Sequence, residues 1–464
     1  MSDSALAEFA RQGIERLSKD DPILYQLLEQ EYHRQTNSLA MVAASSIADL
    51  SVLVCEGMPT GNVTTEGYPR ARFHAGCRFV DDIEELAIER AKVAFKAQYA
   101  NVQPHSGTTA NQLIMFSLLR PGDTILGLEL NSGGHLTHGS KASVSGQYFN
   151  AVGYGLSDEG LIDYQQVARL AWEHKPKLII TGASSYPRFI DFRRFREIAD
   201  EVGAYLLADI SHVAGLVAAG EHPSPVNHAH FTTTSTYKQL YGPRGGLILM
   251  GRDYQNPTHN NSTLSGAIQR AVFPFFQGTP NLNSIAAKAR ALDLLTTDEF
   301  KKLARLIVAD AKALASHFIE RGYRVLTGGT DNHLVLIDVL AGGITGIIAE
   351  RALEECNIVV NKNRIPGDRK PALVTSGMRL GTNSLALRGM GPDEMGHCAH
   401  LIHMVLSSVK PVGERDYELK ESVRLSVQED VAQLCRYFPI PLYPLLPEKS
   451  AVAVYDERAS SMWG

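Results

Sequence analysis

The sequence has few cysteines and no long apolar run, and both absences narrow the class of protein. The cysteines among its 464 residues are Cys55, Cys77, Cys356, Cys398 and Cys435. They are odd in number and form no C-x-x-C pair, which favours a reducing compartment over a disulfide framework or a zinc ribbon. No window approaches the roughly 18 apolar residues of a membrane span, and the N-terminus lacks the pattern of a signal peptide. We therefore expect a soluble, cytoplasmic protein without a membrane partner.

The sequence also lacks a strong excess of charge of either sign. Forty-five basic residues stand against 50 acidic ones, for a formal net charge of −5, and neither half is strongly basic. A nucleic-acid-binding scaffold is therefore not expected. With 44% hydrophobic residues, the chain has enough apolar material for a large core. Its length predicts two or three domains, or one large α/β core with a smaller one.

Short apolar runs alternate with helical patterns through the middle of the chain. The expected strands are 124–128, 177–182, 205–209, 231–236 and 245–250, and the helices between them include 108–119, 162–174 and 191–202. This alternation predicts βαβ units and a mostly parallel sheet covered on both faces. In such sheets, ligands bind at the carboxyl ends of the strands.

The remaining segments predict a division into four parts. We expect an N-terminal helical arm over 1–35, a large ligand-binding domain over 36–310, a smaller α/β domain over 311–440 and an extended C-terminal tail over 441–464. The stretch 36–80 is rich in Gly, Pro, Thr and Ser. It predicts a long functional loop without regular elements.

Three features in chain order point to one kind of chemistry. Ser106-Gly107-Thr108 precede a helix, Asp209 ends an expected strand, and Lys238 lies where a strand gives way to a glycine-rich loop. Each has an ordinary reading, as a helix cap or a loop lysine. Together they offer a phosphate cradle at a helix N-terminus, a carboxylate for a pyridinium nitrogen and an amine for a Schiff base. That set is what pyridoxal phosphate requires.

Several long runs then give a specific resemblance. ANVQPHSGTTAN, ADISHVAGLVAAGEHPSPV, TTTSTYKQLYGPRGG, TSGMRLGT and EGYPRARFHAGC closely resemble the serine hydroxymethyltransferase family, over roughly residues 25–440. The resemblance implies a fold-type I enzyme dependent on pyridoxal phosphate. It implies an α/β large domain with a mostly parallel sheet of seven strands and a smaller C-terminal α/β domain. It also implies a homodimer or homotetramer with the active site at the subunit interface. The implied ligands are an amino-acid substrate and, as a possible co-substrate, tetrahydrofolate.

The resemblance also implies roles for individual residues. Lys238 is similar to the Schiff-base lysine, Asp209 to the partner of the ring nitrogen, His135 to the histidine stacked on the ring, and His212 to the residue at the phenolic oxygen. The implied phosphate ligands are Ser106, Gly107 and Thr108, with Gly278 and Thr279 from a neighbouring subunit. Ser184, Ser235 and Arg244 match further cofactor positions. Arg379 matches the clamp on the substrate carboxylate, Glu66 the acid/base glutamate, and Asn363 a position lining the folate site.

Departures from the family pattern gather on the substrate side. Tyr237 stands where the family has histidine, Ala44 where it has serine, and Thr64 where it has tyrosine. Phe73 and His74 replace paired tyrosines, and Phe275 and Phe276 replace glycines. We expect Thr64 and Tyr237 to contact the substrate, and His74 to join Glu66 in acid/base work. We expect the enzyme to cleave or form the Cα–Cβ bond of a β-hydroxy-α-amino acid, either serine or a larger α-substituted analogue such as 2-methylserine, and the departures favour the larger substrate or a reaction without folate.

The same residues leave other readings open. The scaffold also suits a folate-independent aldolase, a racemase, a transaminase, a decarboxylase or a non-catalytic paralogue that binds the cofactor. His135-x-x-His138 with Asp209-x-x-His212 is a metal-ligand set by count, but the first pair lies in a glycine-rich loop and the resemblance explains three of the four. Ser235-x-x-Lys238 fits a serine-nucleophile string but lacks its partner motifs. We expect no metal.

Overall fold

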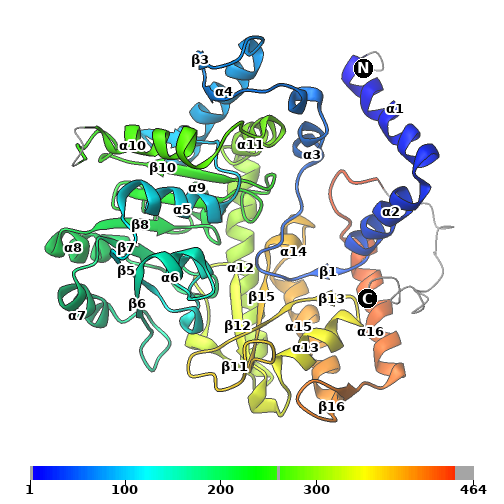
Figure 1. Ribbon diagram of the computed structural model, residues 1–464. Coiled ribbons are helices and arrows are strands. Elements are labelled where there is room, and N and C mark those ends of the chain that lie inside the picture. The colour runs from blue at the N-terminus through cyan, green and yellow to red at the C-terminus, as the bar shows by residue number, and fades with distance from the viewer. Residues whose placement is uncertain (1–3, 259–261, 445–464) are drawn as a thin grey trace.

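A seven-stranded sheet forms the centre of the larger part of the molecule (Figure 1). The computed structural model describes residues 4–258 and 262–444. The strands lie in the order β4-β10-β9-β8-β7-β5-β6, and only β10 runs against its neighbours. Their bounds are β4 Tyr99–Asn101, β5 Thr124–Leu128, β6 Asn150–Tyr154, β7 Leu178–Thr181, β8 Tyr205–Asp209, β9 Phe231–Ser235 and β10 Gly246–Met250. The expected mostly parallel α/β fold is confirmed.

Helices cover both faces of this sheet, and the strand sequences show why. Along β8, Leu206 and Ala208 pack into one core and Leu207 into the other, because successive side chains of a strand point to opposite faces. The helices on the first face are α4 Arg78–Phe95, α7 Tyr164–His174, α8 Phe192–Val202, α9 Ala214–Ala219 and α11 Leu282–Leu294. Those on the second are α5 Gly107–Leu118 and α10 Leu264–Arg270. The short helix α6, Val144–Tyr148, precedes β6.

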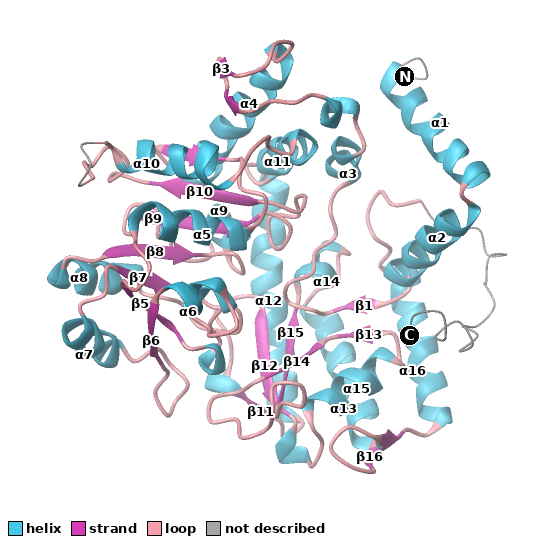
Figure 2. Cartoon of the chain, in the orientation of Figure 1, coloured by secondary structure: helices cyan, strands magenta, loops and turns pink. Residues whose placement is uncertain are grey.

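A second, antiparallel sheet forms the smaller part of the molecule and has its own core. Its strands lie in the order β11-β12-β15-β14, with bounds Arg324–Val325, Leu334–Asp338, Gly377–Gly381 and Asn361–Asn363. The helices here are α13 Gly346–Glu354, α14 Asn383–Leu387, α15 Pro392–Ser408 and α16 Glu421–Tyr437. The long helix α12, Asp298–Glu320, contacts α9 of the larger part and α15 of the smaller one. In Figure 2 the larger sheet lies to the left of α12, and the smaller sheet lies along the lower part of this helix.

Two N-terminal helices stand apart from both cores. Neither α1, Ala5–Asp20, nor α2, Pro22–Thr36, contains a buried residue, and α1 projects from the body of the molecule (Figure 1). Apolar side chains on them, such as Leu6, Phe9 and Ile14, are exposed. The short strand β1, Leu39–Ala40, then pairs in parallel with β13, Ile358–Val359.

The expectation of an unstructured loop over 36–80 is wrong in part. The segment contains β1, helix α3, Leu50–Glu56, and the short hairpin of β2, Gly67–Tyr68, and β3, Ala71–Arg72. Asp49 caps α3 by accepting a hydrogen bond from the N–H of Ser51 at 2.8 Å. Two turns of helix are too short to show a clear apolar period, which is why the sequence pattern missed them.

The ends of the chain are smaller features. A hairpin of β16, Lys410–Pro411, and β17, Tyr417–Glu418, precedes α16. Of the tail expected over 441–464, residues 445–464 lie outside the described part. Among the described residues, no helix is long and apolar enough to cross a membrane.

Candidate active site

A small cavity opens where several strands of the larger sheet end. Strand β8 ends at Asp209 and β9 at Ser235, and the loop after β7 carries Ser184. Because the carboxyl ends of parallel strands share one edge of a sheet, these side chains meet. The cavity is lined by Ser106, Gly107, Thr108, His135, His138, Ala183, Ser184, Asp209, Ser211, His212, Ser235, Tyr237 and Lys238. The structure thus brings together nine of the residues implied for the cofactor or catalysis.

Asp209 is buried and held by donors from three segments. Its Oδ2 accepts a hydrogen bond from the side chain of Asn111 at 2.8 Å and lies 3.3 Å from Nε2 of His138. Its Oδ1 accepts from the hydroxyl and the N–H of Ser211, at 2.6 and 3.0 Å. Burial alone would raise the pKa of Asp209, but the hydrogen bond and charge of His138 hold it well below its usual range. A carboxylate in this setting stays ionised.

Lys238 reaches the same cavity from the loop after β9 and is also buried. Burial lowers its pKa to about 8, helped by the charges of Arg379 and Arg244 and opposed by Asp209. The amine therefore loses its proton more easily than a surface lysine and is a better nucleophile near neutral pH. Its neighbour Tyr237 stacks against Arg244, whose guanidinium carbon lies 3.8 Å from the ring centroid.

The N-terminus of α5 forms the polar end of the cavity. The Ser106 hydroxyl caps the helix by accepting a hydrogen bond from the N–H of Thr109 at 3.0 Å. The first N–H groups of the helix, at Gly107 and Thr108, have no partner inside the helix and lie at its positive end. A Cβ on Gly107 would lie 3.1 Å from the backbone nitrogen of Ser235, so glycine lets the loop pack against the end of β9. This arrangement suits an anion.

Arg379 approaches from β15 of the smaller sheet. Its Nε donates to the side-chain oxygen of Asn361 at 3.1 Å, and its Nη1 donates to the carbonyl of Ser184. Asn361 lies on β14, directly opposite Arg379 in the antiparallel register. Burial lowers the pKa of Arg379 to about 10, so it remains a cation at neutral pH. A fixed guanidinium beside the cavity is suited to bind a carboxylate.

Comparison with known protein families matches residues 17–402 to the family described as serine hydroxymethyltransferase. The chain belongs to this family. It is accordingly a pyridoxal-phosphate-dependent transferase of fold type I, from a family that works in one-carbon metabolism with a folate as co-substrate.

The residues of the cavity fit the cofactor of a serine hydroxymethyltransferase. The hydroxyl of Ser235 and Nδ1 of His212 are buried without a hydrogen-bond partner among the described residues, so they are free for polar atoms of a ligand. Burial lowers the pKa of His135 to about 4 and that of His212 well below its usual value. Both rings therefore stay neutral. Lys238, Asp209, His135 and the start of α5 would hold the aldehyde, the ring nitrogen, the ring face and the phosphate respectively.

Other predicted residues lie outside this cavity. Glu66 and His74 pair with each other, Oε2 to Nε2, at 3.3 Å, and their side chains are 40% and 43% exposed. Thr64 is exposed beside them. Gly278 lies next to Glu66, since a Cβ on Gly278 would be 3.4 Å from its Oε1. None of these residues lines the cavity that Lys238 occupies in its own chain.

Three further predicted positions also fall outside the lining of this cavity. Thr279 and Arg244 line a separate pocket of about 250 Å³ beside Gln103 and His105. Asn363 ends β14, and its amide donates to the carbonyl of Arg364 at 2.5 Å. Arg244 is exposed but stacks on Tyr237, so it borders the cavity without lining it.

Sequence reasoning missed the residues that support the site. Asn111 bridges two strands, donating to Asp209 and accepting from the hydroxyl of Thr233 at 2.5 Å. Asn361 and Ser211 likewise support Arg379 and Asp209. The sequence pattern singles out His138 only as a candidate metal ligand. His135, His138 and Asp209 do place one ligand atom each within 4.8 Å of one another, but the hydrogen bonds to Asp209 account for the cluster without an ion.

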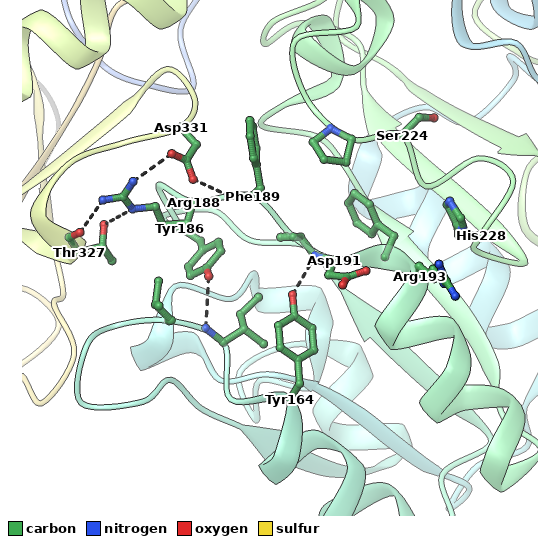
Figure 3. Close-up of a pocket in the computed structure, with 15 residues that line it drawn as sticks. Tyr164, Tyr186, Arg188, Phe189, Asp191, Arg193, Ser224, His228, Thr327 and Asp331 are labelled. Carbon is green, nitrogen blue, oxygen red and sulfur yellow. Dashed lines mark hydrogen bonds and ion pairs between the residues drawn. The ribbon is translucent and has the colours of Figure 1, made fainter.

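The larger pocket of Figure 3 lies elsewhere, under the loop that follows β7. It has a volume of about 860 Å³, and none of the predicted site residues lines it. Arg188 crosses one end, pairing with Asp331 at 3.0 Å and donating from Nε to the hydroxyl of Thr327 at 3.0 Å. These contacts join the loop to the segment before β12 and so help to fix Ser184 and Arg379 relative to each other.

Proposed function

We propose that the enzyme makes or breaks the Cα–Cβ bond of a β-hydroxy-α-amino acid that carries a substituent on its α-carbon, 2-methylserine being the simplest. The observation that carries this proposal is that the departures from the family pattern gather on the substrate side of the site and not among the cofactor residues. The residues implied to hold the cofactor keep the family pattern, whereas Ala44, Thr64, Phe73 and Tyr237, which fall on the substrate side of that pattern, do not. Replacing a tyrosine ring by the small Thr64 removes bulk where the family places the substrate. That space suits a substrate larger than serine.

In this proposal, the amino acid is bound and oriented by Arg379. Asn361 and the Ser184 carbonyl hold the guanidinium of Arg379 in one orientation, so the substrate carboxylate binds to a fixed group and not to a mobile side chain. Fixing the carboxylate fixes which bond of the α-carbon stands ready to break. When bound, pyridoxal phosphate accepts the electron pair that this bond leaves behind. Asp209, kept ionised by His138 and Asn111, maintains the proton on the ring nitrogen that this requires.

We assign the proton of the substrate hydroxyl to Glu66 and His74. Removing that proton allows the Cα–Cβ bond to open, and returning it closes the reverse reaction. The 3.3 Å contact between the carboxylate and the imidazole lets one group relay the proton that the other receives. Phe73 has no hydroxyl and cannot transfer a proton. Glu66 and His74 are therefore the acid/base groups that we assign in this loop.

We further propose a homodimer in which Glu66 and Thr279 of one subunit complete the cavity of the other. Neither residue lines the cavity of its own chain, which supports this. So do exposed apolar side chains nearby, among them Phe73 at 73%, Phe79 at 72% and Phe275 at 65% exposure, since patches of this kind mark interfaces.

The proposed domain division keeps the boundaries 1–35, 36–310, 311–440 and 441–464. Helix α12 spans residue 310, so the junction between the second and third parts lies within one helix. The cytoplasmic location suggested by the cysteines stays a prediction. All five cysteines are free.

A steady-state assay tests the substrate. Purified holoenzyme is supplied with L-serine or 2-methylserine, each with and without tetrahydrofolate. We expect kcat/KM for 2-methylserine to exceed that for L-serine by about tenfold or more, and turnover to require folate. Efficient turnover of L-serine alone would contradict the substrate proposal. Folate-independent release of formaldehyde would support the aldolase alternative instead, and cofactor binding without any turnover would support a non-catalytic paralogue.

A further inference from the structure

A second buried lysine lies close to the cavity, and none of the proposed reaction steps uses it. Lys288, on α11, is only 2% exposed. Its Nζ donates to three backbone carbonyls, those of Val102 at 2.6 Å, Pro104 at 3.1 Å and Gly246 at 3.1 Å. Three such contacts use all three hydrogens of the protonated form, whereas a neutral amine has only two hydrogens to donate. Within residues 4–258 and 262–444, no carboxylate lies within 4.0 Å of this ammonium.

The three carbonyls belong to the two strands of backbone that flank the phosphate cradle. Val102 and Pro104 lie in the segment that leads into Ser106, and Gly246 is the first residue of β10. The N–H of Gly246 also donates to the carbonyl of Pro104 at 2.9 Å. The backbone of Gly246 packs on the Ser106–Gly107 peptide, since a Cβ there would lie 2.3 Å from the carbonyl oxygen of Ser106. Lys288 therefore ties together the supports of the cradle.

A buried cation without a nearby carboxylate is costly unless an anion shares its surroundings. Burial lowers the pKa of Lys288 to about 7, against the opposing charge of Glu84. Glu84 is engaged elsewhere, by Arg72 at 2.6 Å and by Gln103 at 2.7 Å. An anion held at the start of α5 would favour the charged form of Lys288, and by linkage the charged lysine would favour the anion.

We propose that Lys288 is a positioning residue for the phosphate group of the cofactor. Its ammonium group fixes the backbone of the Ser106–Thr108 cradle and adds a buried positive charge beneath it. This inference rests on the assignment of the cradle to the cofactor's phosphate. It does not depend on which amino acid the enzyme uses.

Comparing two ligands that differ only in the phosphate separates this role from a merely structural one. The cofactor is first removed from the full-length enzyme, which is then equilibrated by dialysis against graded concentrations of pyridoxal phosphate or of pyridoxal, and the bound ligand is measured. In Lys288→Met, we expect the Kd for pyridoxal phosphate to rise about tenfold or more and that for pyridoxal to stay within about twofold. The matched control is Leu292→Ala, a buried apolar change on the same helix, which should leave the ratio of the two constants unchanged.

A second variant keeps the test decisive if Lys288→Met does not fold. A Cβ on Gly245 would lie 2.4 Å from Cε and 2.8 Å from Nζ of Lys288. Gly245→Ala therefore displaces the ammonium without removing it, and should shift the same ratio in the same direction. Equal weakening of both ligands in the variants, or no change, would overturn the inference about Lys288. If the wild-type enzyme bound pyridoxal as tightly as pyridoxal phosphate, the cradle assignment itself would fail.

Discussion

At the scale of the residue, the site depends on side chains whose charge is set by their neighbours. Asp209 is buried yet ionised because Asn111, His138 and Ser211 all interact with its oxygens. Lys238 lines the same cavity, and burial lowers its pKa to about 8, so its amine gives up a proton more easily than that of a surface lysine. Neither property belongs to the residue type; both come from placement at the ends of β8 and β9.

The residue at position 64 tests the substrate proposal. In Thr64→Tyr, the restored ring should fill the space that an α-substituent occupies. We expect kcat/KM for 2-methylserine to fall by about tenfold or more, with that for L-serine unchanged or higher. Thr64→Val has nearly the same volume as the wild type and should change neither value much. A parallel fall for both substrates in Thr64→Tyr would mean that the position does not select for size.

The sequence pointed to residues that line the cavity more readily than to residues that support them. Lys238, Asp209 and Ser106 stand at junctions between apolar runs and loops, and that pattern can be read along the chain. Asn111 and Asn361 cannot be found this way, because each acts on a residue far away in sequence, Asp209 and Arg379 respectively. Their roles arise from helix–sheet packing and strand register, which a single sequence does not display.

At the scale of the element, long periodic segments were predictable and short ones were not. The strands at 124–128 and 205–209 and the helix ending near 202 agree closely with β5, β8 and α8. Strand β4 has only three residues, and β6, with sequence NAVGY, contains a glycine and little apolar pattern. The antiparallel direction of β10 could not be predicted from the sequence either, because a strand buried on both faces has the same apolar pattern in either direction.

Helix α12 carries an element-level prediction about stability. Asp310 is fully buried, and neither of its carboxylate oxygens has a hydrogen-bond partner in the described part of the chain. Burial, with the charge of Glu394, raises the pKa of Asp310 to about 7. Between about pH 4 and pH 7 the unfolded chain therefore ionises while the folded one does not. This group consequently removes stability as the pH rises, and the loss is complete above pH 7.

Asp310→Asn cannot ionise and should escape that loss. Relative to the wild type, its free energy of unfolding should increase by about 2–3 kcal/mol between pH 5 and pH 8, as measured by denaturant titration at each pH. The exposed Asp416→Asn serves as the control and should show no such trend. A constant difference between Asp310→Asn and wild type across the pH range would show that Asp310 is ionised in the folded protein.

At the scale of the whole molecule, the single chain leaves its proposed site incomplete. Glu66 and Thr279 lie outside the cavity of their own chain, while α1, α2 and the loop around Phe73 expose apolar side chains. Composition and periodicity could not have shown this, because they describe which residues are apolar but not which are left uncovered after folding. The resemblance to the family supplied the expectation of a subunit interface.

Mixing two inactive variants tests whether sites are shared between subunits. Lys238→Ala and Glu66→Gln should each abolish most activity. Coexpressed in equal amounts, they should recover about a quarter of the wild-type activity, because half of the dimers are mixed and each mixed dimer has one intact site. As a control, coexpression of Lys238→Ala with a chain that carries both Lys238→Ala and Glu66→Gln should recover no activity. If the first pair also stayed inactive, Glu66 would act within its own chain.

The central claim is that the buried amine of Lys238, facing Asp209, holds pyridoxal phosphate. Reducing the holoenzyme with borohydride fixes the cofactor to whichever lysine holds its aldehyde, and peptide mapping by mass spectrometry then locates it. The account predicts the phosphopyridoxyl group on the peptide that contains Lys238, and its loss from that peptide in Lys238→Ala. Recovery of the group on the other buried lysine, Lys288, or on any other lysine of the wild-type enzyme, would contradict it.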